Sequence, residues 1–263
     1  MTKNLATYTQ KVNKRGRIKK KISFFFVLLF IIVFSLLIVN FADIFSSIIT
    51  SRGSLIYGTK IRIPSKVFYA ITLYDAQSKE NAESVCMQVS KSGGAGEIYL
   101  NGDYYVVASI YASHTDADNV KQTLIEDGTE CKILNINIPV MNLEYSGKND
   151  EVLVQGFESF TQTYTFLYDL SIDYDSGKCT TTEVKSEIAK QISKLSQLKS
   201  EILKVYQNEK IEFENNLLSA MNVCIDELNA VLLSSTTDFG LNSQIKKAYC
   251  KILFEYQKLA KTL

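Results

Sequence analysis

The sequence predicts an α+β fold: a four-stranded antiparallel sheet of βαβ-βαβ design with two helices on one face. One transmembrane helix precedes this sheet, and an α-helical bundle or coiled coil follows it. Three observations predict this order: a long uncharged apolar run near the N-terminus, two similar strand-to-helix units, and apolar spacing of helical period from Val152 onward. With 46% hydrophobic residues and two prolines in 263 residues, the chain has enough apolar content for one or two folded domains.

The apolar run predicts a membrane anchor. The segment "SFFFVLLFIIVFSLLIVNF", residues 23–41, has no charged residue and follows the basic stretch "KVNKRGRIKKKI". As a helix it would be about 28 Å long, close to the ~30 Å hydrocarbon core of a bilayer. We therefore expect a cytoplasmic basic tail over residues 1–21 and a transmembrane helix over residues 22–41. A cleaved signal peptide is the alternative, but its apolar region would be shorter and followed by a small-residue cleavage site.

Charge sets the expected topology. Residues 1–21 hold eight Lys or Arg and no acid, and the next basic residue is Arg52. The positive-inside rule then leaves the N-terminus in the cytoplasm and exports the rest of the chain, as a single-pass protein of the cell membrane. The part beyond the membrane has 21 basic and 28 acidic residues, which argues against nucleic acid as a partner. The basic tail is better explained by topology and by contact with anionic lipids.

Residues 42–65 are predicted to be a linker, because Gly53, Gly58 and Pro64 interrupt them. A sheet domain is predicted over residues 66–140. Its strands are expected from alternation and β-branched or aromatic content, with "NGD" at 101–103 as a hairpin turn, and its helices from apolar spacing behind Ser78 and behind Ser113 or Thr115. The expected strands are Val67–Tyr74, Glu97–Asn101, Tyr104–Tyr111 and Glu130–Ile138, and the expected helices are Ser78–Lys91 and Thr115–Glu126. Each βαβ unit would bury half of a shared core.

These two units resemble the SPOR domain, the sporulation-related repeat that binds septal peptidoglycan. The first unit, "YAITLYDAQSKENA", and the second, "YYVVASIYASHTDA", keep much of the pattern of aromatic, aliphatic and alanine positions of the family. The matching positions are Tyr69, Ile71, Leu73, Asn81 and Ala82 in the first unit, and Tyr104, Val106, Ala108, Tyr111 and Ala117 in the second. A coincidental RNP-like βαβ-βαβ domain is the alternative explanation of the pattern.

The departures from the SPOR pattern concern the ligand more than the fold. Thr72 stands where the family has Gln, Tyr74 and Ser109 stand where it has Gly, and Ala76 replaces a Phe. The resemblance implies binding of peptidoglycan glycan strands. An RNA role is not expected, because the sheet lacks the basic and aromatic RNP signature and the domain is exported.

Alternation along the strands places one set of side chains on the side of the sheet away from its two helices. If that side is open, its aromatic rings and hydroxyls would suit a sugar chain. The candidate glycan-binding residues are Ala70, Thr72, Tyr74, Tyr99, Tyr105, Val107 and Ser109. Alternatively, the tyrosines are ordinary strand residues, or the C-terminal region packs over them.

Residues 150–263 are predicted to be helical, as an antiparallel bundle or coiled coil. No Gly or Pro occurs between Lys178 and Phe239, so this stretch is one long helix or two helices joined near Asn208. Such a region could space or recruit partners, such as other envelope or division proteins.

No catalytic residue, metal or cofactor is expected. His114 is the single histidine, which excludes an HExxH zinc site, and neither a GxSxG motif nor a nucleotide-binding glycine motif is present. Asp169, Asp173 and Asp175 are interpreted as a polar helix end. The cysteines are scattered without a framework and are interpreted as small buried apolar residues with free thiols: Cys86, Cys131, Cys179, Cys224 and Cys250.

The functional hypothesis is a bacterial envelope protein whose SPOR-like domain binds glycan during cell division or sporulation. Its rival is a membrane-anchored scaffold or adaptor that works through helical protein contacts without binding glycan.

Overall fold

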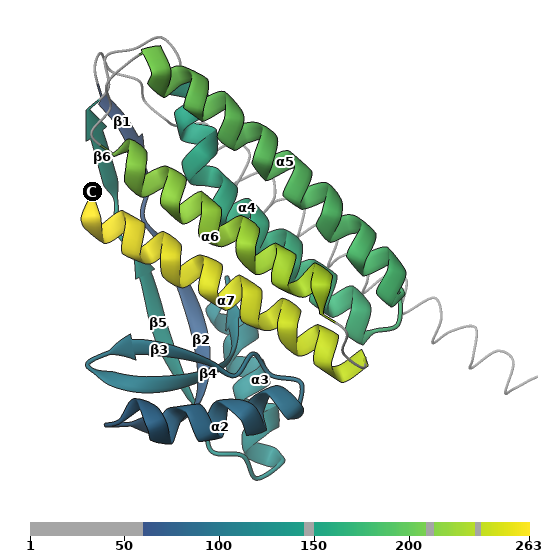
Figure 1. The fold of residues 1–263 in the computed structure, drawn as a ribbon. Coiled ribbons are helices and arrows are strands. Elements are labelled where there is room, and N and C mark those ends of the chain that lie inside the picture. Colours follow the sequence, from purple (N-terminus) through teal and green to yellow (C-terminus); the bar gives the residue numbers. More distant parts are fainter. Residues whose placement is uncertain (1–59, 145–149, 209–212, 235–237) are drawn as a thin grey trace, which may run out of the picture. The chain divides into compact units, whose positions relative to one another are not determined.

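The computed structural model describes residues 60–144, 150–208, 213–234 and 238–263 (Figure 1). The predicted basic tail, the predicted transmembrane helix and residues 42–59 of the predicted linker lie outside the described residues. The described part is α+β, with a small antiparallel sheet and six helices. In chain order the elements are β1 (Lys60–Ile63), β2 (Lys66–Ala76), α2 (Lys79–Lys91), β3 (Glu97–Asn101), β4 (Asp103–Tyr111), α3 (His114–Glu126), β5 (Lys132–Ile138), β6 (Met141–Glu144), α4 (Asp150–Asp175), α5 (Thr181–Asn208), α6 (Glu214–Leu233) and α7 (Asp238–Thr262).

The central sheet has four strands in the order β3-β4-β2-β5, and all neighbouring strands are antiparallel. Each of the four predicted strands is present, with β2 extending beyond the expected end to Ala76. The two predicted helices are also present: the first begins after the expected Ser78, and the second after Ser113, one of the two predicted starts. Ser78 Oγ accepts a hydrogen bond from the Asn81 amide, and Ser113 Oγ accepts one from the Asp116 amide, which satisfies amides at the helix starts.

The chain enters the sheet through a long antiparallel ribbon that the sequence did not predict. β1 pairs with β6 in the same register in which β2 pairs with β5, so residues 60–72 and 132–144 form one continuous ribbon. The ladder is interrupted at Pro64 and Pro139, the two prolines of the chain, because proline has no backbone N–H to donate. The expected linker boundary at residue 65 is therefore wrong, since the described fold already begins at Lys60.

The buried side of the ribbon changes at this interruption. Ile61 and Ile63 are buried before it, whereas Phe68 and Ala70 are buried after it. The switch from odd to even positions indicates that the interruption reorients the ribbon. Both halves therefore bury apolar side chains in the same core cluster.

The C-terminal region is an antiparallel four-helix bundle made by α4 to α7, in which each helix packs against the next one and α7 returns to α4. The expected helical region from 150 to 263 is thus confirmed, and the stretch after Lys178 is two helices, since α5 ends at Asn208 and α6 begins at Glu214. Thr180 begins α5 with a reciprocal pair of hydrogen bonds: its Oγ1 accepts from the Glu183 amide and its amide donates to Glu183 Oε2.

α6 is the one helix in the described residues that is long and apolar enough to cross a membrane by length and composition, over Asn215–Leu233. It packs between α5 and α7 in the bundle. Its apolar stripe is accounted for by these neighbours, because Leu217, Met221 and Leu228 are buried in the core.

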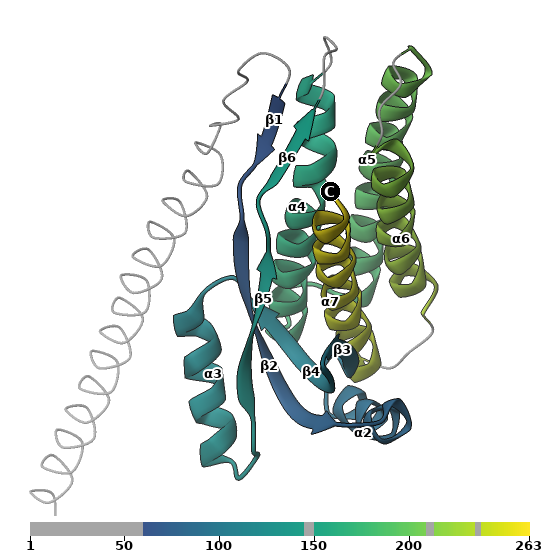
Figure 2. The same ribbon diagram turned by 90° about the vertical axis from the view of Figure 1, so that its left-hand side faces the viewer.

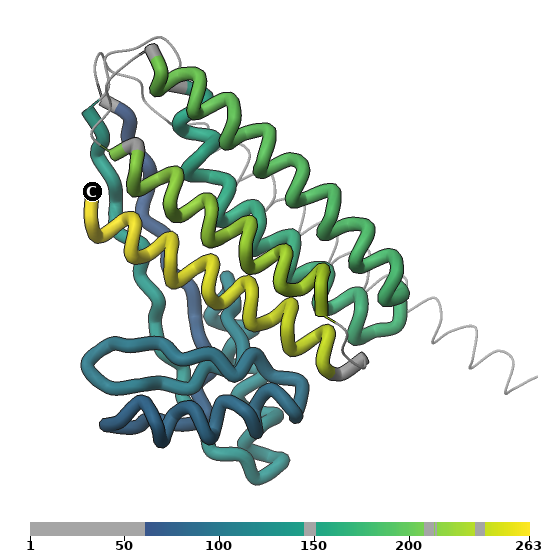
Figure 3. Tube along the Cα trace, in the orientation of Figure 1, coloured from purple at the N-terminus to yellow at the C-terminus, as the bar shows by residue number. Residues whose placement is uncertain are grey.

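The bundle packs against the side of the sheet opposite to α3, as Figure 2 shows. α7 contacts β3, β4 and β5, while α4 contacts β1. α7 ends near the end of the ribbon where β1 and β6 lie (Figure 3). We call the covered surface the bundle-facing side of the sheet, and its apolar members include Phe68, Ala70, Tyr99, Val107, Ile136 and Ile138.

Candidate functional site

The structure contradicts the expectation that the predicted glycan-binding face is open. Ala70 and Val107 are fully buried, and Thr72 and Tyr99 are 3% and 6% exposed. Tyr105 and Ser109 are half-buried. The physical reason is that the bundle-facing side is apolar and is packed against the helices of the same chain.

Tyr99 on β3 is held by α7. Its ring lies against that of Phe254, with centroids 4.8 Å apart, and its hydroxyl donates to Gln257 Oε1 at 2.8 Å. The Gln257 amide nitrogen donates in turn to the backbone oxygen of Asn137 on β5, also at 2.8 Å. Because β3 and β5 are the two edges of the sheet, this one amide joins both edges to α7. The Tyr99 ring and hydroxyl, which were expected to bind a sugar, thus already contact Phe254 and Gln257 of the same chain.

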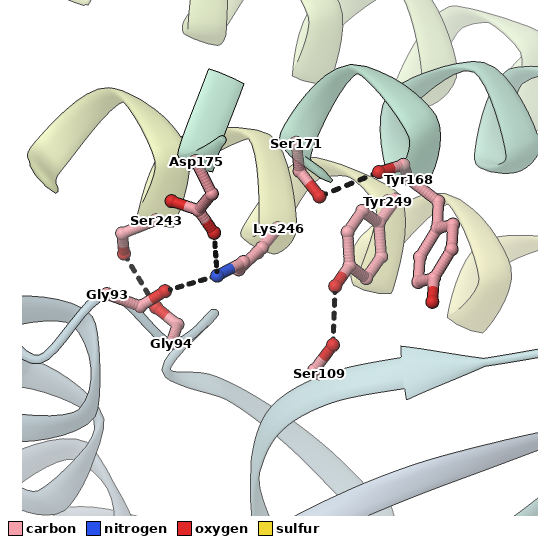
Figure 4. Close-up of polar contacts among 9 residues, drawn as sticks. All are labelled: Gly93, Gly94, Ser109, Tyr168, Ser171, Asp175, Ser243, Lys246 and Tyr249. Atoms are coloured by element: carbon pink, nitrogen blue, oxygen red, sulfur yellow. Dashed lines mark hydrogen bonds and ion pairs between the residues drawn. The ribbon is translucent and has the colours of Figure 1, made fainter. Parts of the chain in front are cut away.

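Ser109 on β4 is likewise occupied. Its hydroxyl lies 2.7 Å from the Tyr249 hydroxyl of α7 (Figure 4). Next to it the Tyr164 hydroxyl of α4 donates to the backbone oxygen of Ile110 at 2.9 Å. Burial raises the pKa of the Tyr164 and Tyr249 hydroxyls well above the usual value, so both stay protonated and able to donate.

A glycine turn between α2 and β3 docks on the start of α7 (Figure 4). Lys246 Nζ donates to the Gly93 oxygen at 3.0 Å and contacts Asp175 Oδ2 of α4 at 3.2 Å, and Ser243 Oγ donates to the Gly94 oxygen at 2.7 Å. This turn was predicted only as a connection between a helix and a strand. Its glycines also fit close backbone packing: a Cβ at Gly96, where φ is +57°, would lie 2.3 Å from the Cys86 oxygen.

Ion pairs extend the same junction along α7. Lys247 pairs with Glu97 of β3 at 3.6 Å, and Lys251 pairs with Glu227 of α6 at 2.8 Å. Burial raises the pKa of the Glu97 carboxyl, against the opposing effect of the two lysines. Burying the charged carboxylate therefore costs desolvation free energy. The ion pair fits a role in fixing the position of α7 more than in stabilising the fold.

Two register shifts in β2 explain the position of Tyr74. They lie between Ile71 and Thr72 and between Thr72 and Tyr74, and after them Tyr74 pairs with Val106. Val106 belongs to the core cluster on the α2 side, so Tyr74, 41% exposed, does not lie beside Ala70 as strict alternation predicted. Thr72 keeps the expected side, and its hydroxyl donates to the Lys132 oxygen at 3.4 Å.

A strip beside the covered region is more accessible. Tyr105 is half-buried and pairs with Tyr99 on one side and with Asp75 on the other. Asp75 forms an exposed ion pair with Lys132 at 2.9 Å. The half-exposed Tyr105 ring and the neighbouring solvated ion pair are thus accessible from solvent.

The other singled-out residues take structural positions. His114 is exposed at the start of α3, with its ring 5.0 Å from that of Tyr69. All five cysteines are free, and burial raises the pKa of the Cys86 thiol to about 11 and that of Cys224 to about 12. Cys224 and Cys250 are buried, as expected of small apolar residues, whereas Cys86, Cys131 and Cys179 are only half-buried. Within the described residues no group of three or more His, Cys, Asp or Glu is placed to hold a metal ion.

The residues that occupy the site, Tyr249, Phe254 and Gln257, were not singled out from the sequence. The apolar pattern of the strands did indicate that this side of the sheet is covered. Phe68, Ile136 and Ile138 lie on the same side as Ala70 and Val107, so the central strands are apolar on both sides, as in a sheet covered on both faces.

No protein-family model matches the chain, and neither the curated proteins nor the solved structures include a match to it.

Proposed function

We propose that this protein is a membrane-anchored envelope scaffold, whose exported sheet and bundle act as one module that binds other envelope proteins. The proposal keeps the predicted single span at residues 22–41, with the N-terminus in the cytoplasm, and a role in cell division or sporulation. It retains the resemblance of residues 66–140 to the SPOR domain as a hypothesis.

One observation carries the choice of a scaffold over a glycan reader: the bundle-facing side of the sheet is part of a continuous core with α4 and α7. Freeing Tyr99 and Val107 for a ligand would expose this apolar side to water, together with the facing side of α7. At roughly 25 cal/mol per Å² of apolar surface, exposing several large side chains costs many kcal/mol, more than weak sugar contacts return.

Partner binding is then assigned to the outer surfaces of the module. α5 exposes mainly polar side chains, among them Lys190, Lys194, Ser196 and Gln197. Polar helical surfaces of this kind suit contacts that form and dissociate, and the membrane anchor raises the effective concentration of the module near other anchored proteins.

Glycan binding remains the second candidate, because the strip formed by Tyr105 with the pair of Asp75 and Lys132 stays accessible. A single tyrosine ring can stack on the apolar face of one pyranose, and the charged pair can bind the polar rim of the sugar. This arrangement predicts weak binding that depends on Tyr105.

Sedimentation with purified peptidoglycan sacculi separates the two candidates. Residues 55–263 and the Tyr105→Ala variant should be compared, with sacculi carrying stem peptides and with sacculi stripped of them by an amidase. The scaffold proposal predicts no retention above background for either protein. Retention that Tyr105→Ala abolishes would replace it with the glycan candidate.

Location in the cell is the complementary test. A fluorescent full-length chain should reach the division site or the sporulation septum equally well with Tyr105→Ala, if protein contacts set its location. The double variant Lys190→Glu and Lys194→Glu on α5 should disperse it while Tyr105→Ala does not. The reverse pattern would count against the scaffold.

A further inference from the structure

Two lysines of α5 carry positive charge that the described part of the chain does not neutralise. Lys185 Nζ donates to the Ser234 backbone oxygen just after α6, and Lys199 Nζ donates to Asn222 Oδ1 of α6. Both acceptors are neutral, and within the described residues neither lysine pairs with a carboxylate. These two contacts place both lysines on the flank of α5 that is turned toward α6.

Two more lysines, Lys190 and Lys204, lie on the opposite flank of α5, toward α4, and both are exposed. Gln191, next to Lys190, identifies this flank because its Nε2 donates to Thr163 Oγ1 of α4 at 3.1 Å. Lys190 pairs with Glu187 at 2.6 Å, an exposed contact of a kind that contributes little and can be exchanged for another carboxylate. Lysines therefore stand on both flanks of the helix.

Between these flanks runs a heptad stripe that the described residues leave uncovered. α5 packs against α4 and α6 and lies on the side of the bundle away from the sheet (Figure 1). Its buried stripe, with Val184, Ile188 and Leu195, faces those two helices. The exposed stripe repeats at alternating spacings of three and four residues, the spacing by which a second helix packs along a first. We call it the outer stripe, and its members are Ser186, Ala189, Ser193, Ser196, Ser200 and Leu203.

The composition of the outer stripe is unusual for a face that is merely solvated. Ser is a weaker helix former than Lys, Glu or Gln, yet all four serines of α5 lie on this stripe. Small side chains let a second helix backbone approach closely, whereas Leu203, 37% exposed, offers one apolar contact. A local preference that is given up at the surface, between two rows of lysines, indicates a binding face.

A second copy of the chain does not fit this face. In a parallel pair of α5 helices each flank meets the opposite flank of the other helix, which sets Lys185 against Lys190 and Lys199 against Lys204. Such like-charge contacts are destabilising. An antiparallel pair avoids them, but it turns the two Lys60 ends, which lead to the predicted anchors, to opposite ends of the pair. That arrangement is poorly suited to two anchors in one membrane.

We propose that the outer stripe of α5 binds an acidic amphipathic helix of a partner protein, with aliphatic side chains along its seam and Glu or Asp on both flanks. The lysine rows select a helix of opposite charge and disfavour a basic one, and the small residues of the stripe set how closely the helix lies. This inference rests on the proposed scaffold function, because it names the class of partner for the helix to which that function assigns binding.

Peptide binding to residues 55–263, which form a compact unit, tests the outer stripe. The probe is a fluorescent peptide as long as α5, with leucine along its seam and Glu on both flanks, whose like charges keep it from pairing with itself. One control peptide has the same composition in scrambled order, and a second has Lys in place of each flanking Glu. Ser193→Trp fills the middle of the stripe, and Ser84→Trp places the same side chain at an exposed serine of α2.

In anisotropy titrations the acidic peptide should bind at least about tenfold more tightly than either control peptide, and its affinity should fall as salt is raised. Ser193→Trp should weaken this binding at least about tenfold, while Ser84→Trp leaves it unchanged; circular dichroism checks that both variants fold. Equal binding of the scrambled peptide would indicate a general anion-binding surface and would overturn the proposal.

Three other results would also overturn it: no binding of the acidic peptide, binding that Ser193→Trp does not weaken, or a dimer of residues 55–263 in sedimentation velocity that Ser193→Trp dissociates. The last result would assign the stripe to a second copy instead. The location of the full-length chain in the cell tests the scaffold separately, because that measurement does not depend on the partner being a helix.

Discussion

Substitutions at Val107 and Val67 test whether the bundle covers this side of the sheet. Val107 is fully buried on the bundle-facing side, whereas Val67 on the neighbouring strand β2 is 42% exposed. Val107→Ala removes two methyl groups, which costs about 1.6 kcal/mol at ~0.8 kcal/mol per group, and the cavity left behind adds about 1 kcal/mol. We expect the free energy of unfolding to fall by about 2–3 kcal/mol, and the Tm to fall by about 4–12 °C for a unit of this size.

The assay is urea and thermal unfolding of residues 55–263, followed by circular dichroism, with Val67→Ala as the matched control. The same chemical change at Val67 should alter the free energy of unfolding by no more than about 0.5 kcal/mol. An open sheet face would make the two substitutions similar. Equal small effects at both positions would therefore refute the packing of α7 on the sheet.

Two further changes test the junction between sheet and bundle, and a third tests the packing of the glycine turn on α2. Gln257→Leu should lower the free energy of unfolding by about 1–3 kcal/mol, because the buried Tyr99 hydroxyl loses its partner and the part-buried Asn137 carbonyl loses a hydrogen bond; a loss below about 0.5 kcal/mol in urea unfolding would contradict the bridge. Glu97→Gln should flatten the pH dependence of stability: burial raises the pKa of this carboxyl above 4.5, so its contribution is fully present below that value and is lost as the pH rises through the raised pKa. Unchanged pH dependence in urea titrations would contradict this. Gly96→Ala should cost more than about 2 kcal/mol, since the new Cβ would meet the Cys86 oxygen, while Gly102→Ala, with φ +81° and open space, should cost only about 1 kcal/mol; similar costs in thermal unfolding would contradict the close packing.

The local structure could be predicted from the sequence because its causes are local. Ser78 and Ser113 begin helices by accepting amide hydrogen bonds three residues on, and the turn at Gly102 joins two strands. The helical period after Val152 likewise depends on residues three and four apart. Each of these signals lies within a few residues of the element that it predicts.

The remaining features depend on contacts between distant parts of the chain. β1 is a strand because it pairs with residues far along the chain, and nothing in the sequence around Pro64 indicates that partner. Register shifts turn Tyr74 to the α2 side, and alternation alone cannot reveal them. The predicted open face is covered for a related reason: side chains such as Tyr99 lie on the predicted side, but whether that side is open depends on α7, more than a hundred residues away.

Hydrogen exchange of residues 55–263, resolved by residue, tests most directly whether the sheet and α7 form one core. If they do, amides of β2, β4 and α7 open together in one cooperative step with the same free energy. Exchange of α7 at a clearly lower free energy, with the strands still protected, would show that the helix leaves the sheet while the sheet stays folded. That result would contradict the scaffold and return the sheet face to the glycan hypothesis.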